Sequence, residues 1–231
     1  MFANSSLVVS SQLGIHPQLE RVVRRHLDSQ FQRPISSTGN RSFDLVSEWL
    51  RAMLGRSLIL DSGCGTGWSA RRLAEKYSDA AVLGADRSGV RLARSAGAAS
   101  TDVHVAGNLC LARTNLEDLW PQLLRFGVRV ERHFLFYPNP SPKPWQLKRR
   151  WHAHPLFPVI LALGGTLELR SNWKTYVDEF ARALELAGRS TVVNSIGPSE
   201  PAVSPFEIKY RASGHDLWRL TCDLRLTLTS I

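Results

Sequence analysis

Cysteine and long uncharged apolar runs are both scarce in this chain of 231 residues. The three cysteines, Cys64, Cys110 and Cys222, are odd in number and have no paired spacing, which argues against a disulfide framework and against a zinc site. No charge-free run approaches the roughly 18 residues of a membrane span, and the first residues lack the basic-then-apolar order of a signal peptide. These absences predict a cytoplasmic protein with no metal and no membrane partner.

Acidic residues are also few compared with basic ones. Lys and Arg total 29 and Asp and Glu total 20, which gives a formal net charge of +9 and a sequence pI of about 10.1. Basic residues gather at Arg21, Arg24 and Arg25 and again between Lys143 and Arg150. Clustered cations favour a nucleic-acid partner because they release counterions from phosphates. The alternative is a protein that is basic without binding nucleic acid.

Apolar runs alternate with helical patterns along the chain and predict an α/β fold. Hydrophobic residues make up 43% of the chain, which is enough for one domain with a hydrophobic core at residues 43–231. Seven runs are interpreted as strands: 58–60, 81–85, 108–112, 132–137, 166–169, 189–194 and 217–226. The N-terminal segment, residues 1–42, contains one basic amphipathic helix at about 16–31. That helix is either a substrate-binding arm or simply packed on the domain.

A glycine turn follows the first predicted strand. Gly63, Gly65 and Gly67 stand where the chain must turn sharply and let a ligand approach its backbone. Asp61 precedes the glycines, and Asp86 ends the second strand about 20 residues later, a position suited to holding a ribose diol. A dinucleotide site would carry Gly-x-Gly-x-x-Gly, whereas an acid before the glycines suits a cationic ligand better than a phosphate.

This stretch resembles motif I of the class I S-adenosylmethionine-dependent methyltransferases. The resemblance implies a Rossmann-like fold, a seven-stranded and mostly parallel sheet with helices on both faces, and S-adenosylmethionine as cofactor. It also implies that Asp61 lies near the methionine end, that Asp86 with the adjacent Arg87 lies at the ribose, and that Asn115 and Leu116 read the adenine. The alternative for Asn115 is that it only caps the helix that follows.

The fourth strand leads into an unusual loop, YPNPSPKPWQLKRRW, at residues 137–151. In open α/β sheets the reaction site lies beyond the carboxyl ends of the strands. Prolines fix φ, which lowers the entropy of holding Asn139 in one pose. Basic and aromatic side chains together can follow a phosphate backbone and stack an unpaired base, at roughly 1–3 kcal/mol per base. Here they are Lys143, Trp145, Lys148, Arg149, Arg150 and Trp151.

The loop resembles the Pro-Asp-Pro-Trp-x-Lys and Lys-Arg-Arg segments of the bacterial tRNA (guanine-N7) methyltransferases. Ser171, Asn172 and Tyr176 are similar to that family's Thr-Asp and following Tyr, and Ser204, Phe206 and Glu207 to part of its C-terminal motif. The resemblance implies methylation of guanine N7 in tRNA. Its implied catalytic residues are Asn139, Lys143, Asn172 and Glu207. Its implied substrate-binding residues are Lys143, Lys148, Arg149, Arg150, Ser171, Asn172 and Tyr176.

Two departures bear on the substrate. Asn139 and Asn172 stand where the family carries aspartates, so either a different base edge is read or compensation comes from Glu207, Asp178 or Glu179. N7 offers an available lone pair, so its methylation needs no general base. Two alternatives stay open: a divergent relative that methylates a small purine-like heterocycle or another RNA base, and a non-catalytic RNA-binding protein. The sequence leaves the choice between monomer and homodimer open.

Overall fold

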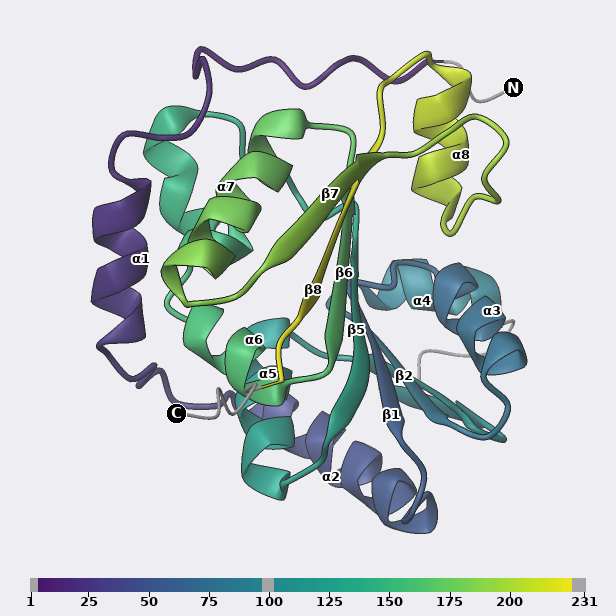
Figure 1. Cartoon of the computed structure of the whole chain (residues 1–231). Helices are drawn as coiled ribbons and strands as arrows, with labels where there is room; N and C mark the ends of the chain where they lie inside the picture. Colours follow the sequence, from purple (N-terminus) through teal and green to yellow (C-terminus); the bar gives the residue numbers. More distant parts are fainter. Residues whose placement is uncertain (1–3, 97–101, 226–231) are drawn as a thin grey trace. The chain divides into compact units, whose positions relative to one another are not determined.

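The computed structural model describes residues 4–96 and 102–225, which form two compact units (Figure 1). The central unit is Arg33–Leu135, and the terminal unit combines Met1–Gln32 with Phe136–Ile231. The predicted boundary between residues 42 and 43 falls inside helix α2, Ser37–Ala52, and that division into domains stays a prediction. None of the described helices is long and apolar enough to cross a membrane.

Five strands form the sheet of the central unit, in the order β3-β4-β2-β1-β5. They are β1 (Leu58–Ser62), β2 (Ala81–Asp86), β3 (Val103–Ala106), β4 (Leu109–Arg113) and β5 (Val130–Phe136). β1 is parallel to β2 and β5, β2 is parallel to β4, and only β3 is antiparallel to its neighbour. β1 and β2 are buried along their whole length, as parallel strands covered on both faces are.

The central unit also contains α2, α3 (Trp68–Lys76), α4 (Gly89–Ala96) and α5 (Leu116–Phe126). Two adjacent side chains of β1 show that these helices cover both faces of its sheet. Asp61 accepts a hydrogen bond from the Ser69 hydroxyl of α3, whereas Ser62 accepts one from the Trp120 indole of α5. Successive side chains of a strand point to opposite faces, so α3 and α5 lie on different sides.

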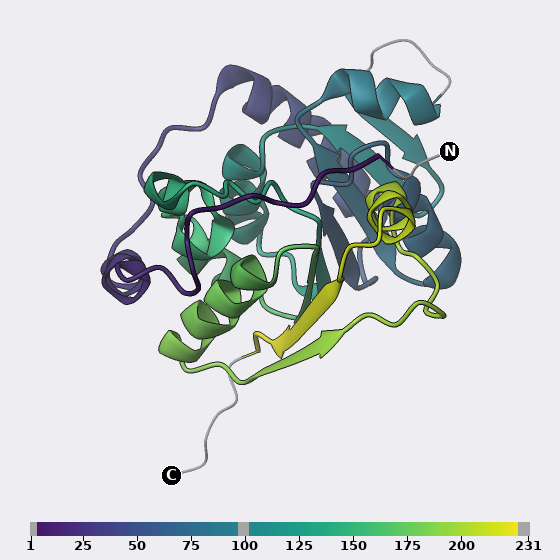
Figure 2. The same ribbon diagram turned by 90° about the horizontal axis from the view of Figure 1, so that it is seen from above.

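Three antiparallel strands form the sheet of the terminal unit, in the order β6-β8-β7. They are β6 (Thr166–Ser171), β7 (Thr191–Ser195) and β8 (Trp218–Asp223). The helices of this unit are α1 (Leu19–Leu27), α6 (Phe157–Leu163), α7 (Lys174–Leu186) and α8 (Pro205–Ala212), with the short 3-10 helices η1 (Pro144–Arg149) and η2 (Trp151–Ala153). The N-terminal segment runs from beside α8 to α1 (Figures 1 and 2), and Ser5 donates to Ser213 at 3.1 Å.

The structure corrects the predicted strand count from seven to eight among the described residues. The additional strand, β3, forms a hairpin with β4 through Gly107 and Asn108, and Gly107 has a φ of +59°. A two-residue Gly-Asn turn was the available sequence signal for this hairpin. Helix α8 was also not predicted, although Ser204 caps it by accepting from the Glu207 N–H at 3.2 Å. Leu226, at the end of the last predicted strand, lies outside the described residues.

Candidate functional site

The glycine turn after β1 adopts a backbone that other residues rarely tolerate. Gly63, Gly65 and Gly67 have φ values of +84°, +62° and +78°. A Cβ on Gly67 would lie 2.8 Å from the Leu111 side chain, so this position has no room for one. Gly67 is the N-cap of α3, and no side chain in the described part of the chain caps this helix, so its first N–H groups are available to a polar ligand.

Asp61 is a buried acid, and only one of its two carboxylate oxygens is hydrogen-bonded within the described residues. Its exposed fraction is 1%, and its Oδ2 accepts a hydrogen bond from Ser69 Oγ at 2.5 Å. Its Oδ1 is buried and has no hydrogen-bond partner among the described residues. The pKa of Asp61 is raised to about 7, chiefly by burial; the Ser69 bond opposes the rise and the charge of the neighbouring Asp86 adds to it. A cationic group would satisfy this oxygen and restore the carboxylate.

Asp86 is held against the same turn. Its Oδ2 accepts from the Gly65 N–H at 3.0 Å, and its Oδ1 accepts from the Ser88 N–H at 2.8 Å. Arg91 of α4 lies 3.2 Å from Oδ1. Two backbone donors and a guanidinium fix the carboxylate, and an ionised carboxylate has acceptor capacity left for a diol. Arg91 and Ser69 are contacts that the sequence analysis missed, because nothing local distinguishes them from other helix residues.

The remaining predicted cofactor residues lie at the ends of β2 and β4. Arg87 is exposed, Asn115 is exposed and Leu116 is half-buried. The Thr114 N–H donates to the Asp86 carbonyl at 3.1 Å, which ties the end of β4 to the end of β2. Asn115 occupies the N-cap position of α5, but its side chain makes no cap hydrogen bond. The structure therefore bonds Asp86 directly to the glycine turn at Gly65 and keeps Asp61 in the strand that leads into this turn. Asn115 follows Thr114, the residue bonded to Asp86.

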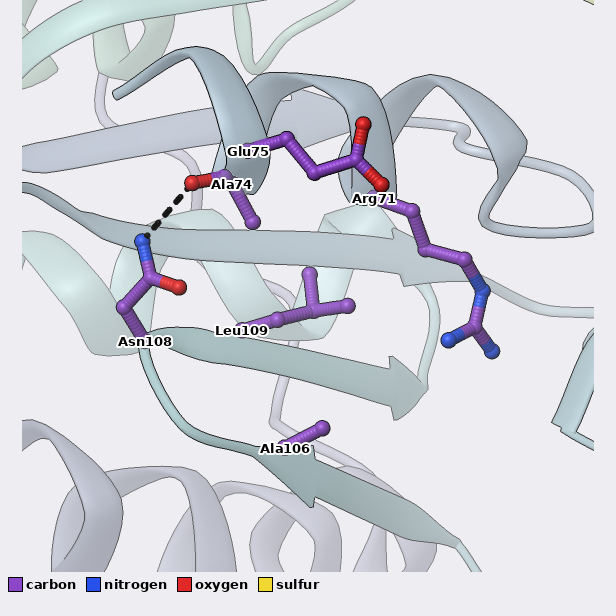
Figure 3. Close-up of a pocket in the computed structure, with 6 residues that line it drawn as sticks. All are labelled: Arg71, Ala74, Glu75, Ala106, Asn108 and Leu109. Atoms are coloured by element: carbon purple, nitrogen blue, oxygen red, sulfur yellow. Dashed lines mark hydrogen bonds between the residues drawn. The ribbon is translucent and has the colours of Figure 1, made fainter. Parts of the chain in front are cut away.

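A shallow hollow in the central unit lies elsewhere. It has a volume of about 270 Å³ and is lined by Arg71, Ala74, Glu75, Ala106, Asn108 and Leu109 (Figure 3). Asn108 donates to the Ala74 carbonyl there at 3.2 Å. The lining residues come from α3 and from the hairpin at the amino end of β4, whereas the glycine turn lies at the carboxyl ends of β1 and β2. The hollow is therefore not the predicted cofactor site.

In the terminal unit, the proline-rich loop after β5 has a strained backbone. Tyr137 and Ser141 have φ values of +52° and +45°, which is uncommon for residues other than glycine. The exposed Asn139 accepts from the Ser141 N–H through Oδ1 at 3.1 Å, which leaves its amide N–H₂ available. The surrounding fold thus presents the Asn139 amide in a defined pose.

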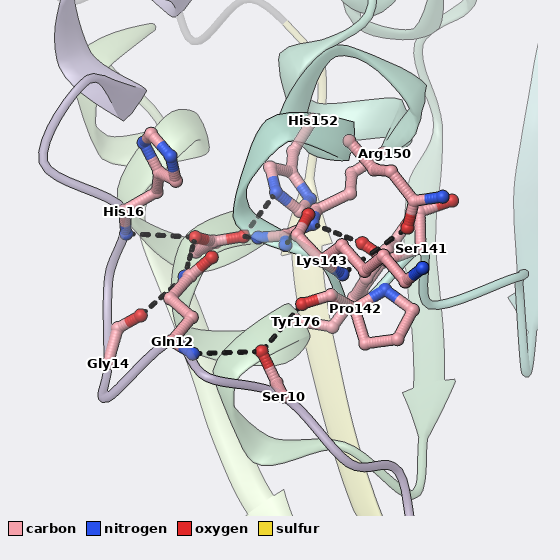
Figure 4. A network of polar contacts seen from close by, with 12 residues as sticks. Ser10, Gln12, Gly14, His16, Ser141, Pro142, Lys143, Arg150, His152 and Tyr176 are labelled. Carbon is pink, nitrogen blue, oxygen red and sulfur yellow. Dashed lines mark hydrogen bonds and ion pairs between the residues drawn. The ribbon is translucent and has the colours of Figure 1, made fainter.

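Arg150 holds this loop from inside the protein (Figure 4). It is fully buried, and it donates to Glu179 Oε2 at 2.5 Å and to the Ser141 carbonyl at 3.1 Å. The expectation that Arg150 contacts substrate is therefore wrong, because its guanidinium is shielded from solvent and occupied. Burial tends to raise the pKa of Glu179, but His152 and Arg150 outweigh it and hold the pKa at about 2. Gln12 and the His16 backbone bind the other oxygen of Glu179 at 2.6 and 2.9 Å.

Three more predicted residues are structural. Tyr176 is fully buried and its hydroxyl accepts from the Trp151 N–H at 3.2 Å. Glu207 is fully buried and lies 3.1 Å from Arg170 and 3.2 Å from Arg211. Ser171 is buried and accepts from the Trp173 N–H at 3.1 Å. Side chains enclosed in this way do not reach a substrate, so the predicted direct roles of all three are corrected to support of the fold.

Asn172 and the exposed cations are accessible. Asn172 is half-buried and donates to His215 Nδ1 at 2.9 Å, while His215 Nε2 donates to the Ser5 carbonyl at 3.0 Å. His215 is a neighbour that the sequence analysis missed. Lys143, Lys148 and Arg149 are exposed. Neither Glu179 nor Glu207 compensates for the two asparagines, because both are bound to arginines, and Asp178 is bound to Lys174.

The parallel strands, the glycine turn and its two acids define a class I methyltransferase, and comparison with known proteins agrees. The family model Methyltransf_4, described as "Putative methyltransferase", matches residues 55–220. The chain therefore belongs to this methyltransferase family. A comparison with curated proteins found no match.

Solved structures give the same fold. The 16S rRNA methyltransferase KamB has 18% identity and a TM-score of 0.56, with 83% of this chain and 94% of that chain covered. A mutant 16S rRNA (adenine(1408)-N(1))-methyltransferase from Catenulisporales acidiphilia, solved with its cosubstrate SAM, has 18% identity and a TM-score of 0.55, covering 80% and 93%. An antibiotic-related methyltransferase has 15% identity and a TM-score of 0.53, covering 82% and 96%. The predicted class I α/β fold is confirmed, and S-adenosylmethionine is the cofactor of this class.

Proposed function

We propose that this protein transfers a methyl group from S-adenosylmethionine to a ring nitrogen of an RNA base. The observation that carries the proposal is the pair of buried acids around the glycine turn. The buried Asp61 Oδ1, which has no partner among the residues described, fits the ammonium at the methionine end of the cofactor, and the fixed Asp86 carboxylate fits a ribose diol. These two fits come from the side chains themselves, independently of the family match.

Asn115 and Leu116 complete the proposed cofactor site at the adenine. Asn115 is exposed and its amide is free of a cap bond, so it can hydrogen-bond an adenine edge, and the half-buried Leu116 offers an apolar surface. When bound, the cofactor supplies an electrophilic methyl on its sulfonium: the ring-nitrogen lone pair forms the new N–C bond as the S–C bond breaks. The protein's part is then to hold and orient the base and to exclude water.

A ring nitrogen is favoured because the terminal unit offers amides next to its loop. Asn139 and Asn172 are neutral, and the nearby Glu179 and Glu207 are tied to arginines. A nitrogen with an available lone pair needs no base to remove a proton, so this set of side chains suffices. The same set suits an amine or hydroxyl poorly, because such a group must lose a proton during transfer.

An RNA base is favoured by the exposed part of the loop. Lys143, Lys148 and Arg149 are exposed beside Trp145, whose side chain is 68% exposed. Guanine N7 in tRNA is the first candidate, from the resemblance of the loop and later motifs. Adenine N1 is the second, because it is also a ring nitrogen with a free lone pair and is the atom named for one matched structure.

The test is transfer of a labelled methyl group from S-adenosylmethionine to total tRNA, to ribosomal subunits and to free guanosine and adenosine, followed by nucleoside analysis. We expect label in RNA, as 7-methylguanosine or 1-methyladenosine. Label in the free nucleosides alone would assign a small heterocyclic substrate instead. Cofactor binding without transfer to any of these substrates would count against the proposal, and loss of both would favour a non-catalytic RNA-binding protein. Asp61→Asn serves as the matched inactive control.

Asp61 predicts a pH dependence of cofactor affinity. Its pKa of about 7 means that it is mostly protonated at pH 5.5, whereas the cationic ligand favours the carboxylate, so binding releases a proton. Affinity should therefore rise with pH, by roughly tenfold between pH 5.5 and 7. Isothermal calorimetry across this range measures it, and two buffers of different ionisation enthalpy report the proton. Asp61→Asn should bind weakly and without this slope; a flat profile for the unmodified protein would contradict the assignment.

A further inference from the structure

Helix α1 presents a basic face to solvent. Leu19, Val22, Val23 and His26 are buried, and the helix packs against α7, α6 and η2 (Figure 1). The packing turns Arg21, Arg24 and Arg25 outward. Arg24 is paired with Glu20 at 2.8 Å. Arg21 and Arg25, one turn apart and about 6 Å along the axis, have no acidic partner among the described residues.

The 3-10 helix η1 presents a second basic group built around an aromatic ring. Trp145 is 68% exposed, and its ring centroid lies 5.6 Å from Lys143 Nζ and 5.5 Å from Arg149 Cζ. Lys148 is also exposed. An exposed indole with two cations beside it can stack on an unpaired base while the cations bind neighbouring phosphates.

The two basic groups share one surface of the terminal unit. α1 packs on η2, which follows η1 directly in the chain. Phe31, beyond the end of α1, has its ring 6.2 Å from that of His154, and His154 lies 5.2 Å from Trp151. Both groups also lie near His26. Burial is the largest cause that lowers the pKa of His26, and the charge of Arg25 from one group and that of Lys148 from the other lower it further. We call the residues Arg21, Arg25, Lys143, Trp145, Lys148 and Arg149 the α1–η1 surface.

Cations elsewhere in the terminal unit are mostly neutralised. Arg24, Arg150, Arg170, Lys174, Arg182, Arg211, Arg219 and Arg225 each pair with a carboxylate. Among the described residues of this unit, the cations without a carboxylate are the five of the α1–η1 surface, together with Arg189 and Lys209. Five uncompensated charges on one surface repel one another, and a polyanion relieves that repulsion.

We propose that the α1–η1 surface binds the phosphate backbone of a folded RNA on which the target base lies, so that the substrate is a structured RNA and not a free nucleotide. The inference rests on the proposed function for the identity of the chemistry, but binding at this surface is measurable without any methyl transfer. The exposed indole favours RNA over an acidic protein, because stacking needs a π-face as well as negative charge.

The test compares binding of total tRNA between 50 and 200 mM salt for three double variants. Arg21→Gln/Arg25→Gln and Lys148→Gln/Arg149→Gln should each weaken binding roughly tenfold and lower the slope of log K against log salt by about 1.5. Arg125→Gln/Arg129→Gln, which removes two exposed arginines of the central unit, is the control and should leave both quantities almost unchanged. Trp145→Ala should weaken binding roughly five- to a hundredfold with the slope unchanged.

Two further readouts separate this inference from the proposed function. Cofactor affinity should be unaffected in both surface variants, which shows that they are folded. If RNA is not methylated but both surface variants lose RNA affinity, the surface assignment stands and the catalytic proposal falls. If RNA is methylated and both variants bind tRNA with the affinity and salt slope of the unmodified protein, the assignment is overturned. Loss of affinity in the η1 variant alone would also overturn it, because α1 would then play no part.

Discussion

Replacing Arg150 with methionine is expected to lower the free energy of unfolding by about 3–5 kcal/mol. The substitution leaves the fully buried Glu179 without its arginine partner and frees the Ser141 carbonyl, whose bond from Arg150 holds the strained loop. An unpaired buried charge is costly because the protein interior does not solvate it as water does. Urea unfolding of the full chain, followed by tryptophan fluorescence, measures the change.

Arg149→Met is the matched control for this experiment. Arg149 is the adjacent residue of the same type, but it is exposed and forms no ion pair within the described residues, so its replacement should change stability by less than about 0.5 kcal/mol. Equal effects of the two substitutions would show that the Arg150–Glu179 pair is not what holds the loop.

The pH dependence supplies a second check on the same pair. Glu179 has a pKa of about 2 in the folded protein against an ordinary value of 4.5. A lowered pKa means that its contribution is fully present above pH 4.5 and is lost as the pH falls from 4.5 towards 2. The difference in stability between the unmodified protein and Arg150→Met should therefore shrink over that window. A difference that stays constant down to pH 2 would argue that the loss reflects packing of the guanidinium against Trp173, which lies 4.9 Å away.

Replacing Asp86 with alanine should weaken S-adenosylmethionine binding by roughly 10- to 100-fold. The carboxylate would be lost both as the proposed acceptor for the ribose diol and as the acceptor that fixes the Gly65 N–H at 3.0 Å. Hydrogen bonds to charged groups are worth about 1.5–3 kcal/mol each, which sets the expected range. Calorimetric titration of the cofactor measures the affinity.

Two companion variants make this result interpretable. Asp79→Ala removes an exposed acid from the segment before β2 and should bind the cofactor normally. Asp86→Asn keeps the shape and the acceptor oxygen, so it should fall between the alanine variant and the unmodified protein. If Asp86→Ala binds as tightly as the unmodified protein while retaining its thermal stability, the ribose assignment is wrong.

The central unit was the more predictable half of the chain, because its signals are local. An apolar run buried on both faces, three glycines that need positive φ and two acids at strand ends all express requirements of a few adjacent residues. The predicted strands at 58–60 and 81–85 agree with β1 and β2 within about two residues. β3 escaped prediction because four residues of an edge strand carry almost no periodic signal.

Arg149 and Arg150 of the basic loop were both predicted to bind substrate, but in the fold Arg149 is exposed and Arg150 is buried. Their neighbours in the chain give no reason to distinguish them. Arg150 is internal because Glu179 lies on α7, 29 residues away, and because Gln12, 167 residues from Glu179, covers the other side of the carboxylate. Glu207 was misassigned for the same reason, since its partner Arg170 lies 37 residues earlier.

The sequence by itself determined the class of this protein, its cofactor and the backbone of its glycine turn, because neighbouring residues set the local backbone geometry and the burial of a strand. Only the tertiary structure decided which charged side chains are paired inside the protein and which are exposed to solvent. The charge of a side chain is fixed by its type, but whether that charge is paired and desolvated depends on residues brought together from distant parts of the chain. For this protein that distinction separates the buried Arg150 and Glu207 from the exposed cations of the α1–η1 surface.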